Sequence, residues 1–194
     1  MKKTVKILAF VLCAVMLVVG SVFGTYAYLT SQTGEVTNTF TVGNVAITLD
    51  ETDVDVYGVK DTDDRVKENV YKLIPGHTYV KDPTVHVAAG SEAAWLFVKV
   101  EDGIAAIQGA TTIADQLEDN GWTPLDGVAN VYTREKVVSK NEVQNFQVFG
   151  SFTLTDDANV SAYASASITV TAYAVQADGF ENAKDAWTAA NFGA

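Results

Sequence analysis

Alternating apolar and polar residues predict β-strands through most of the chain beyond its first 27 residues. In the first such run, Val36, Phe40 and Val42 lie on one face and three threonines lie on the other. This period of two is typical of a strand with one buried face. Gly43 interrupts the run, and a second alternating segment starts at Val45. The folded part of the chain is therefore predicted to begin with two consecutive strands.

Six later segments also have a strand-like pattern. They are Asp53 to Tyr57, Tyr79 to Val87, Trp95 to Glu101, Val128 to Thr133, Asn145 to Leu154 and Ser167 to Gln176. Pro83 has no backbone N–H, so the second segment is predicted to lie at a sheet edge or to contain a bulge. The third is apolar on both faces near its start, which predicts a central strand or one covered by a partner. The rest of the acidic stretch from Asp50 to Glu68 is predicted to be a solvated loop.

Two short segments have helical signals, Thr112 to Asn120 and Asn182 to Asn191. Thr112 is suited to cap the first helix, and Gly121 is suited to end it. The second helix carries Trp187 on an apolar stripe. Many short strands with few helices predict an all-β fold, specifically an antiparallel β-sandwich with one or two short helices.

A basic and apolar leader precedes the strands. Lysines at positions 2, 3 and 6 are followed by an apolar run of 13 residues from Ile7 to Val19. This length suits the helix of a signal peptide and is short for a membrane span. Small residues before the cut predict cleavage after Ala27, with Tyr28 as the first mature residue; a cut after Gly24 and an uncleaved membrane anchor are the alternatives. The predicted division is a signal peptide at 1–27 and one secreted domain at 28–194, with membrane contact only through the uncleaved leader.

The charge of the chain bears on its partners. Its 194 residues carry a net charge of −11, and three of its 13 basic residues are in the leader. The remaining ten basic residues face 24 acidic ones, a net charge of −14 for the mature part. Such a surface repels phosphate backbones, so nucleic acid is not expected as a partner. The single cysteine, Cys13, is in the leader, so the mature part cannot form a disulfide within itself.

No catalytic or metal-binding motif stands out in the sequence. Its two histidines are His77, in a predicted turn, and His86, on a predicted strand, whereas zinc peptidases most simply carry H-E-x-x-H on a helix. No G-x-S-x-G nucleophile motif occurs. Asp61 to Asp63 begins like a calcium loop, but Arg65 and Val66 do not fit its fifth and sixth positions; an irregular calcium site is the alternative. We therefore predict a non-enzymatic protein without a metal or cofactor.

Several motifs resemble those of the camelysin/TasA-type secreted proteins. They are G-T-Y-A-Y-L-T from Gly24 to Thr30, V-T-N-T-F-T-V-G-N-V-A-I-T-L-D-E from Val36 to Glu51, L-I-P-G-H-T-Y-V-K-D-P-T-V-H-V from Leu73 to Val87, G-S-E-A-A-W-L-F-V-K-V from Gly90 to Val100 and A-Y-A-V-Q-A-D-G-F from Ala172 to Phe180. The leader with the first strands is the most specific of these, and the likeness is weak between Glu101 and Val137.

This resemblance implies a jelly-roll sandwich that is exported by a Gram-positive bacterium. It implies cleavage of the leader by a SipW-type signal peptidase and a place at the cell surface or in the biofilm matrix. The best-known members of the family form extracellular fibres, so further copies of the chain or related matrix proteins are the implied partners. The roles of main fibre subunit, anchor and modulator are all open. Camelysin itself has been classed as a metallopeptidase, which is the alternative function.

The segment from Tyr28 to Val42 is predicted to act as an exchangeable strand. Main-chain hydrogen bonds do not depend on which chain supplies the strand, so it can pair within its own sheet or with a neighbour. Val36, Phe40 and Val42 are expected to fill the same apolar groove in either case. Polar residues from Thr30 to Gly34 are expected to form a hinge. A permanent strand in a monomer is the alternative.

Aromatic side chains suggest a third function, a surface that binds carbohydrate or protein. They are Trp95, Phe97, Phe149, Tyr163 and Tyr173. Aromatic rings offer large flat contact areas. At strand spacing, however, aromatic residues more often belong to the core, so this function ranks below the structural one.

Overall fold

The computed structural model describes residues 30–32 and 45–192 of the chain. These residues form mostly β-structure. The strands are β1 (Thr30–Gln32), β2 (Ile47–Val54), β3 (Lys60–Val66), β4 (Thr78–Val80), β5 (Thr84–Val87), β6 (Ala94–Asp102), β7 (Thr123–Pro124), β8 (Val131–Thr133), β9 (Gln144–Gln147), β10 (Ser151–Thr153) and β11 (Ile168–Gln176). The helices are α2 (Ile113–Asp119) and α3 (Ala183–Ala190), with short 3-10 turns η1 (Ala105–Ile107) and η2 (Val160–Tyr163). The predicted all-β class with two short helices is confirmed.

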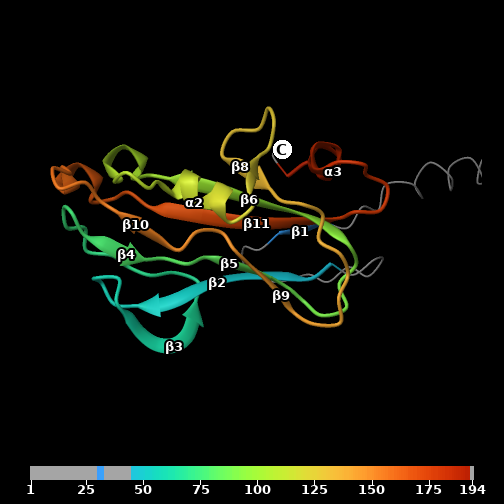
Figure 1. Ribbon diagram of the computed structural model, residues 1–194, viewed down its shortest axis with the longest axis horizontal. Coiled ribbons are helices and arrows are strands. Elements are labelled where there is room, and N and C mark those ends of the chain that lie inside the picture. The colour runs from blue at the N-terminus through green and yellow to red at the C-terminus, as the bar shows by residue number, and fades with distance from the viewer. Residues whose placement is uncertain (1–29, 33–44, 193–194) are drawn as a thin grey trace, which may run out of the picture.

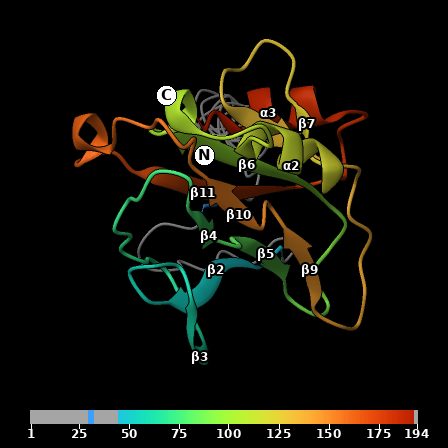
Figure 2. The same ribbon diagram turned by 60° about the vertical axis from the view of Figure 1, so that its left-hand side comes forward.

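The strands form two larger sheets and one small one, and every strand pair is antiparallel. The five-stranded sheet has the order β1-β11-β6-β8-β7, the four-stranded sheet has the order β3-β2-β5-β9, and β10 pairs with β4. Figure 1 shows β6 and β11 in one layer and β2 and β5 in another, with α3 on the far side of the first layer. Figure 2 shows the same layers turned by 60°.

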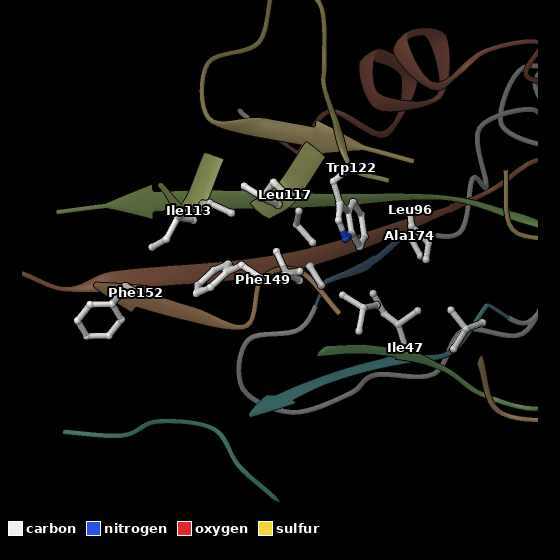
Figure 3. Packing of buried hydrophobic residues seen from close by; sticks show 14 of the residues in the cluster. Ile47, Leu96, Ile113, Leu117, Trp122, Phe149, Phe152 and Ala174 are labelled. Atoms are coloured by element: carbon white, nitrogen blue, oxygen red, sulfur yellow. The ribbon is translucent and has the colours of Figure 1, made fainter. Parts of the chain in front are cut away.

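The main core cluster takes side chains from both larger sheets. Leu96 and Val98 of β6 are fully buried, and in the antiparallel register they lie opposite Ala174 and Ala172 of β11. Ile47 of β2 belongs to the same cluster, and Figure 3 shows it below Leu96 and Ala174. The Leu96 and Val98 side of β6 therefore faces the main core.

A second cluster covers the opposite face of the five-stranded sheet. Phe97 of β6 and Tyr173 and Val175 of β11 pack there with Trp187 of α3. The Phe97 and Trp187 ring centroids are 5.1 Å apart. This cluster explains why Trp95 to Glu101 is apolar on both faces: β6 is a central strand, as predicted, and part of its second face is covered by α3.

Local signals determine the helix ends. Thr112 accepts a hydrogen bond from the backbone N–H of Asp115, whose side chain in turn accepts one from the Thr112 backbone, which forms a capping box. Gly121 follows α2 with φ of +80°, a conformation that glycine adopts without strain. Asn182 caps α3 through the N–H of Asp185. Both predicted helices are therefore confirmed.

The acidic stretch is a β-hairpin, and the prediction of a solvated loop there is wrong. β2 continues to Val54, the chain turns at Gly58 with φ of +74°, and β3 returns beside β2. The Asp55 side chain accepts hydrogen bonds from the N–H groups of Tyr57 and Val59, which closes the turn. Nearly all of β3 is exposed, so its charged residues remain solvated although they belong to a sheet.

Two predicted strands are each split in the structure, and their breaks face one another. Tyr79 to Val87 forms β4 and β5, and Asn145 to Leu154 forms β9 and β10. At the breaks, the Val148 N–H donates to the Pro83 carbonyl over 2.8 Å and the Lys81 N–H donates to the Gly150 carbonyl over 3.3 Å. Pro83 cannot donate to a ladder, so regular pairing stops there and β4 joins a different sheet from β5.

Candidate functional site

The edge of the five-stranded sheet is the candidate assembly site. There β1 pairs with β11 in antiparallel register, with Thr30 opposite Val175, Ser31 opposite Ala174 and Gln32 opposite Tyr173. On its other side, β11 pairs with β6 along all nine of its residues. The N-terminal part of the described chain thus supplies the outermost strand of this sheet.

The site residues predicted from the sequence lie outside the described residues. These are the predicted cleavage residues Ala27 and Tyr28 and the predicted exchange residues Val36, Phe40 and Val42. The neighbouring prediction of a hinge from Thr30 to Gly34 is wrong for Thr30–Gln32, because these three residues form β1. Backbone pairing with β11 outweighs the polar composition from which a hinge was inferred.

The β11 edge is supported by the second core cluster. Tyr173, opposite Gln32, packs its ring against Trp187 with the centroids 5.3 Å apart. Phe192 lies against both rings, at 4.6 Å from Tyr173 and 5.1 Å from Trp187. Helix α3 therefore holds the residues of β11 that pair with β1.

Two other sheet edges among the described strands, β3 and β7, carry features that disfavour further pairing. β3 is lined with exposed charged residues, and β7 has only two residues, one of which is Pro124. Charges, shortness and proline are common ways to protect a sheet edge from other chains. Compared with these two edges, the β1 side is the better place for the exchange of a strand.

An ion-pair network covers the outer face of the four-stranded sheet. The Arg65 guanidinium contacts the Asp50 carboxylate and lies 3.2 Å from the Asp82 carboxylate. His86 Nε2 lies 2.8 Å from the same Asp50 oxygen, and His86 Nδ1 lies 2.7 Å from Asn145 Oδ1. The network joins β3, β2, β5 and β9, the four strands of this sheet. It gives His86 structural partners on the strand face where the sequence placed it.

The network shifts the titration of Asp50. Partial burial favours the protonated form, but the hydrogen bonds and charges of Arg65 and His86 outweigh it and hold the pKa of the Asp50 carboxyl below its ordinary value of 3.8. The ionised form of Asp50 therefore contributes stability that is present above the unfolded-state pKa. This contribution is lost as the pH falls through the lower folded-state pKa.

We expect Arg65→Ala to move acid unfolding to higher pH. The substitution removes a partner that lowers the Asp50 pKa, and at neutral pH it should cost roughly 1 kcal/mol because the pair is partly exposed. Urea unfolding at a series of pH values from neutral to acidic measures both effects. Lys60→Ala, which removes the more exposed Lys60–Asp63 pair, should have a smaller effect. Identical acid midpoints for Arg65→Ala and the wild type would contradict the prediction.

The sequence did not predict a polar cluster around the buried residues Glu51 and Lys81. Glu51 and Lys81 are only 3% and 9% exposed, and Lys81 Nζ lies 2.5 Å from Glu51 Oε2. The Asn69 side chain donates to the other oxygen of the same carboxylate over 3.0 Å. One signal was available: Ile47, Leu49 and Glu51 share one parity on β2, so Glu51 continues an inward-facing series.

The other residues that the sequence singled out make structural contacts or belong to the core. His77 Nε2 lies 2.9 Å from the Tyr57 carbonyl oxygen, and its ring packs against Tyr79 with centroids 4.5 Å apart. Of the aromatic residues considered as an exposed platform, Phe97, Phe149 and Tyr173 are buried in the core, so an exposed platform of these rings is contradicted.

Within residues 30–32 and 45–192, no group of three or more histidine, cysteine, aspartate or glutamate side chains is placed to hold a metal ion. No helix in this part of the chain has the length and hydropathy of a membrane span.

The chain was compared with family models, curated proteins and solved structures, and it has no significant match to any of them.

Proposed function

We propose that this protein is a secreted, non-enzymatic structural subunit of a biofilm matrix or cell envelope that polymerises by exchange of its N-terminal strand. In this proposal, a SipW-type signal peptidase removes residues 1–27 and the mature domain is a jelly-roll sandwich. The placement of a core cluster between two antiparallel sheets supports the sandwich. The resemblance of the leader and first strands to the camelysin/TasA-type proteins supports the location at the surface of a Gram-positive bacterium.

The observation that carries the proposal is the position of β1. It is the outermost strand of its sheet, it belongs to the N-terminal segment, and it contributes three residue pairs to β11, whereas β6 contributes nine. A neighbour's β1 can replace such a strand with the same main-chain hydrogen bonds. The exchange is therefore nearly neutral in ladder energy, and longer contacts with the neighbour can favour it.

Head-to-tail exchange explains growth into filaments. The donated strand and the accepting β11 edge are different surfaces, so the contact is heterologous and does not close on itself. While the leader holds Tyr28 at the membrane, the strand cannot move freely to a neighbour. Cleavage after Ala27 is then the step that permits assembly.

Deleting Tyr28 to Val42 should abolish filaments and leave a monomer that binds the missing segment as a synthetic peptide. We expect saturable binding by fluorescence anisotropy, and we expect that bound peptide cannot restore polymerisation because it links no second subunit. Circular dichroism of the truncated protein checks that it is folded. A peptide with Val36, Phe40 and Val42 replaced by serine is the control and should bind at least tenfold more weakly, since it loses about 1.5–3 kcal/mol per fully buried apolar side chain.

Two results would contradict the proposal. One is full-length mature protein that stays monomeric at high concentration and at acidic pH, where its negative charge is reduced. The other is a truncated protein that still forms filaments, which would place the subunit contact elsewhere.

A further inference from the structure

Three polar side chains from separate segments meet where two of them, Glu51 and Lys81, are buried and Asn69 is partly buried. Glu51 lies on β2, Asn69 follows β3 and Lys81 follows β4, and these strands lie at the same end of the molecule (Figure 1). The Glu51 carboxylate bridges the other two, with Lys81 Nζ 2.5 Å from Oε2 and Asn69 Nδ2 3.0 Å from Oε1. An amine and a carboxamide are thus held on the two oxygens of one carboxylate.

The Asn69 amide is held in one orientation by its hydrogen bonds. Its Nδ2 also donates to the Thr52 carbonyl over 2.9 Å, and its Oδ1 accepts from the Val54 N–H over 3.1 Å. The carbonyl oxygen therefore faces a backbone donor, while the nitrogen faces the carboxylate. This is the polarity that an acyl transfer at Asn69 requires, with a donor at the oxygen that becomes negative and a proton source at the leaving nitrogen.

Aromatic rings pack beside Lys81, which is 9% exposed. Lys81 Nζ lies 5.9 Å from the centre of the Tyr71 ring, and that ring packs edge-on against Tyr79 and Phe152. Burial, followed by the charge of Glu51, raises the pKa of the Tyr71 hydroxyl above its ordinary range. Low access to water protects a lysine nucleophile and limits competing hydrolysis of the amide.

We propose that Lys81 and Asn69 join in an intramolecular isopeptide bond, with Glu51 as the proton carrier. Glu51 takes a proton from the Lys81 ammonium group, and the neutral Nζ attacks Cγ of Asn69. The negative charge that develops on Oδ1 is stabilised by the Val54 N–H. Glu51 passes a proton to Nδ2, the Cγ–Nδ2 bond breaks and ammonia leaves.

Atoms and charges balance in this step. Of the three protons on the Lys81 ammonium group, one stays on the new amide, one leaves with ammonia and one ends on Glu51. The buried ion pair becomes a neutral amide beside a neutral carboxyl group, so no charge is left unpaired in the core. No electrons are exchanged and no co-reactant is consumed.

The cross-link would join two segments at this end of the domain by a covalent bond. Residue 69 follows the β2–β3 hairpin and residue 81 follows β4, so the bond ties the chain after the hairpin to the β4–β5 connection. A cross-link of this kind restricts the unfolded chain, as a disulfide does, in a protein whose only cysteine is Cys13. This bond would form within one chain and does not depend on strand exchange.

Mass spectrometry of the purified, denatured protein tests the proposal. We expect a mass about 17 Da below that of the unmodified sequence, the mass of one ammonia. After digestion with trypsin, we expect residues 68–72 to be attached through Asn69 to residues 73–99, because a modified Lys81 is not cleaved. Tandem spectra locate the branch independently of where the N-terminus begins.

Matched variants separate the cross-link from other losses of ammonia. Lys81→Arg, Asn69→Ala and Glu51→Gln should each show the full mass, whereas Lys72→Arg should keep the deficit of about 17 Da and the branched peptide. The wild-type measurement decides the proposal even if a variant fails to fold. A wild-type protein of full mass that trypsin cleaves after Lys81 would overturn it, and so would a deficit found in a linear peptide.

Discussion

Replacing Trp122 by alanine is expected to lower the free energy of unfolding by about 3–5 kcal/mol, as for other large core truncations. Trp122 is fully buried in the main cluster, where Figure 3 shows it close to Leu117 of α2. Its Nε1–H donates to the Gln147 carbonyl over 2.8 Å, and the Arg134 guanidinium lies 5.1 Å from its ring centre. The substitution removes apolar burial, leaves a cavity and deprives the Gln147 carbonyl of a donor, and all three effects are unfavourable.

Urea unfolding followed by circular dichroism measures this loss. Trp122→Phe keeps an aromatic ring but loses the donor to Gln147, so it should lie between alanine and wild type. Val138→Ala alters a side chain that is 55% exposed and should change stability by less than about 0.5 kcal/mol. A loss under about 1 kcal/mol for Trp122→Ala would show that this side chain does not stabilise the core as its complete burial indicates.

Replacing Trp187 by alanine is expected to cost a similar amount, about 3–5 kcal/mol, and also to weaken strand pairing at the β11 edge. Trp187 is 9% exposed and contacts the rings of Phe97, Tyr173 and Phe192. Tyr173 lies opposite Gln32 of β1, so loss of this packing loosens the strand that accepts β1. Under the proposed function, Trp187→Ala should therefore raise the concentration needed for filament growth.

Two control variants test whether the effect of Trp187→Ala on assembly is specific to the second cluster. Thr188→Ala changes an exposed residue of the same helix and should leave stability and assembly close to wild type. Trp122→Ala should lower stability equally but affect assembly less, provided that both proteins are folded at the temperature of the assay. Equal assembly by Trp187→Ala and Trp122→Ala would contradict a special role for the second cluster.

The structure of the acidic stretch was only partly predictable from the sequence. The many carboxylates from Asp50 to Glu68 indicated a solvated surface, and most of β3 is indeed exposed. Composition alone did not indicate that the stretch pairs as a hairpin, because the turn depends on Gly58 and on the Asp55 side chain together. Nor did it indicate that Glu51 is buried, since the compensating partners Asn69 and Lys81 lie 18 and 30 positions away.

The candidate assembly site was predicted only in part. The sequence predicted that the N-terminal segment contains a strand that can pair within its own sheet, and β1 lies at a sheet edge. It did not predict that Thr30–Gln32 forms that strand, because the three residues are polar and lack an apolar alternation. Their pairing depends on the exposed backbone edge of β11, which no local pattern reveals.

By itself, the sequence determined the features that depend on neighbouring residues. These are the all-β class, the strand character of β6 and β11, and the ends of α2 and α3, because side-chain alternation and helix capping act over a few positions. The tertiary structure alone decided which strands pair, which segment lies opposite the irregularity predicted at Pro83, and which charged groups share a buried position. Those outcomes depend on contacts between residues far apart in the chain, and the balance between burial and pairing is settled only when the segments meet.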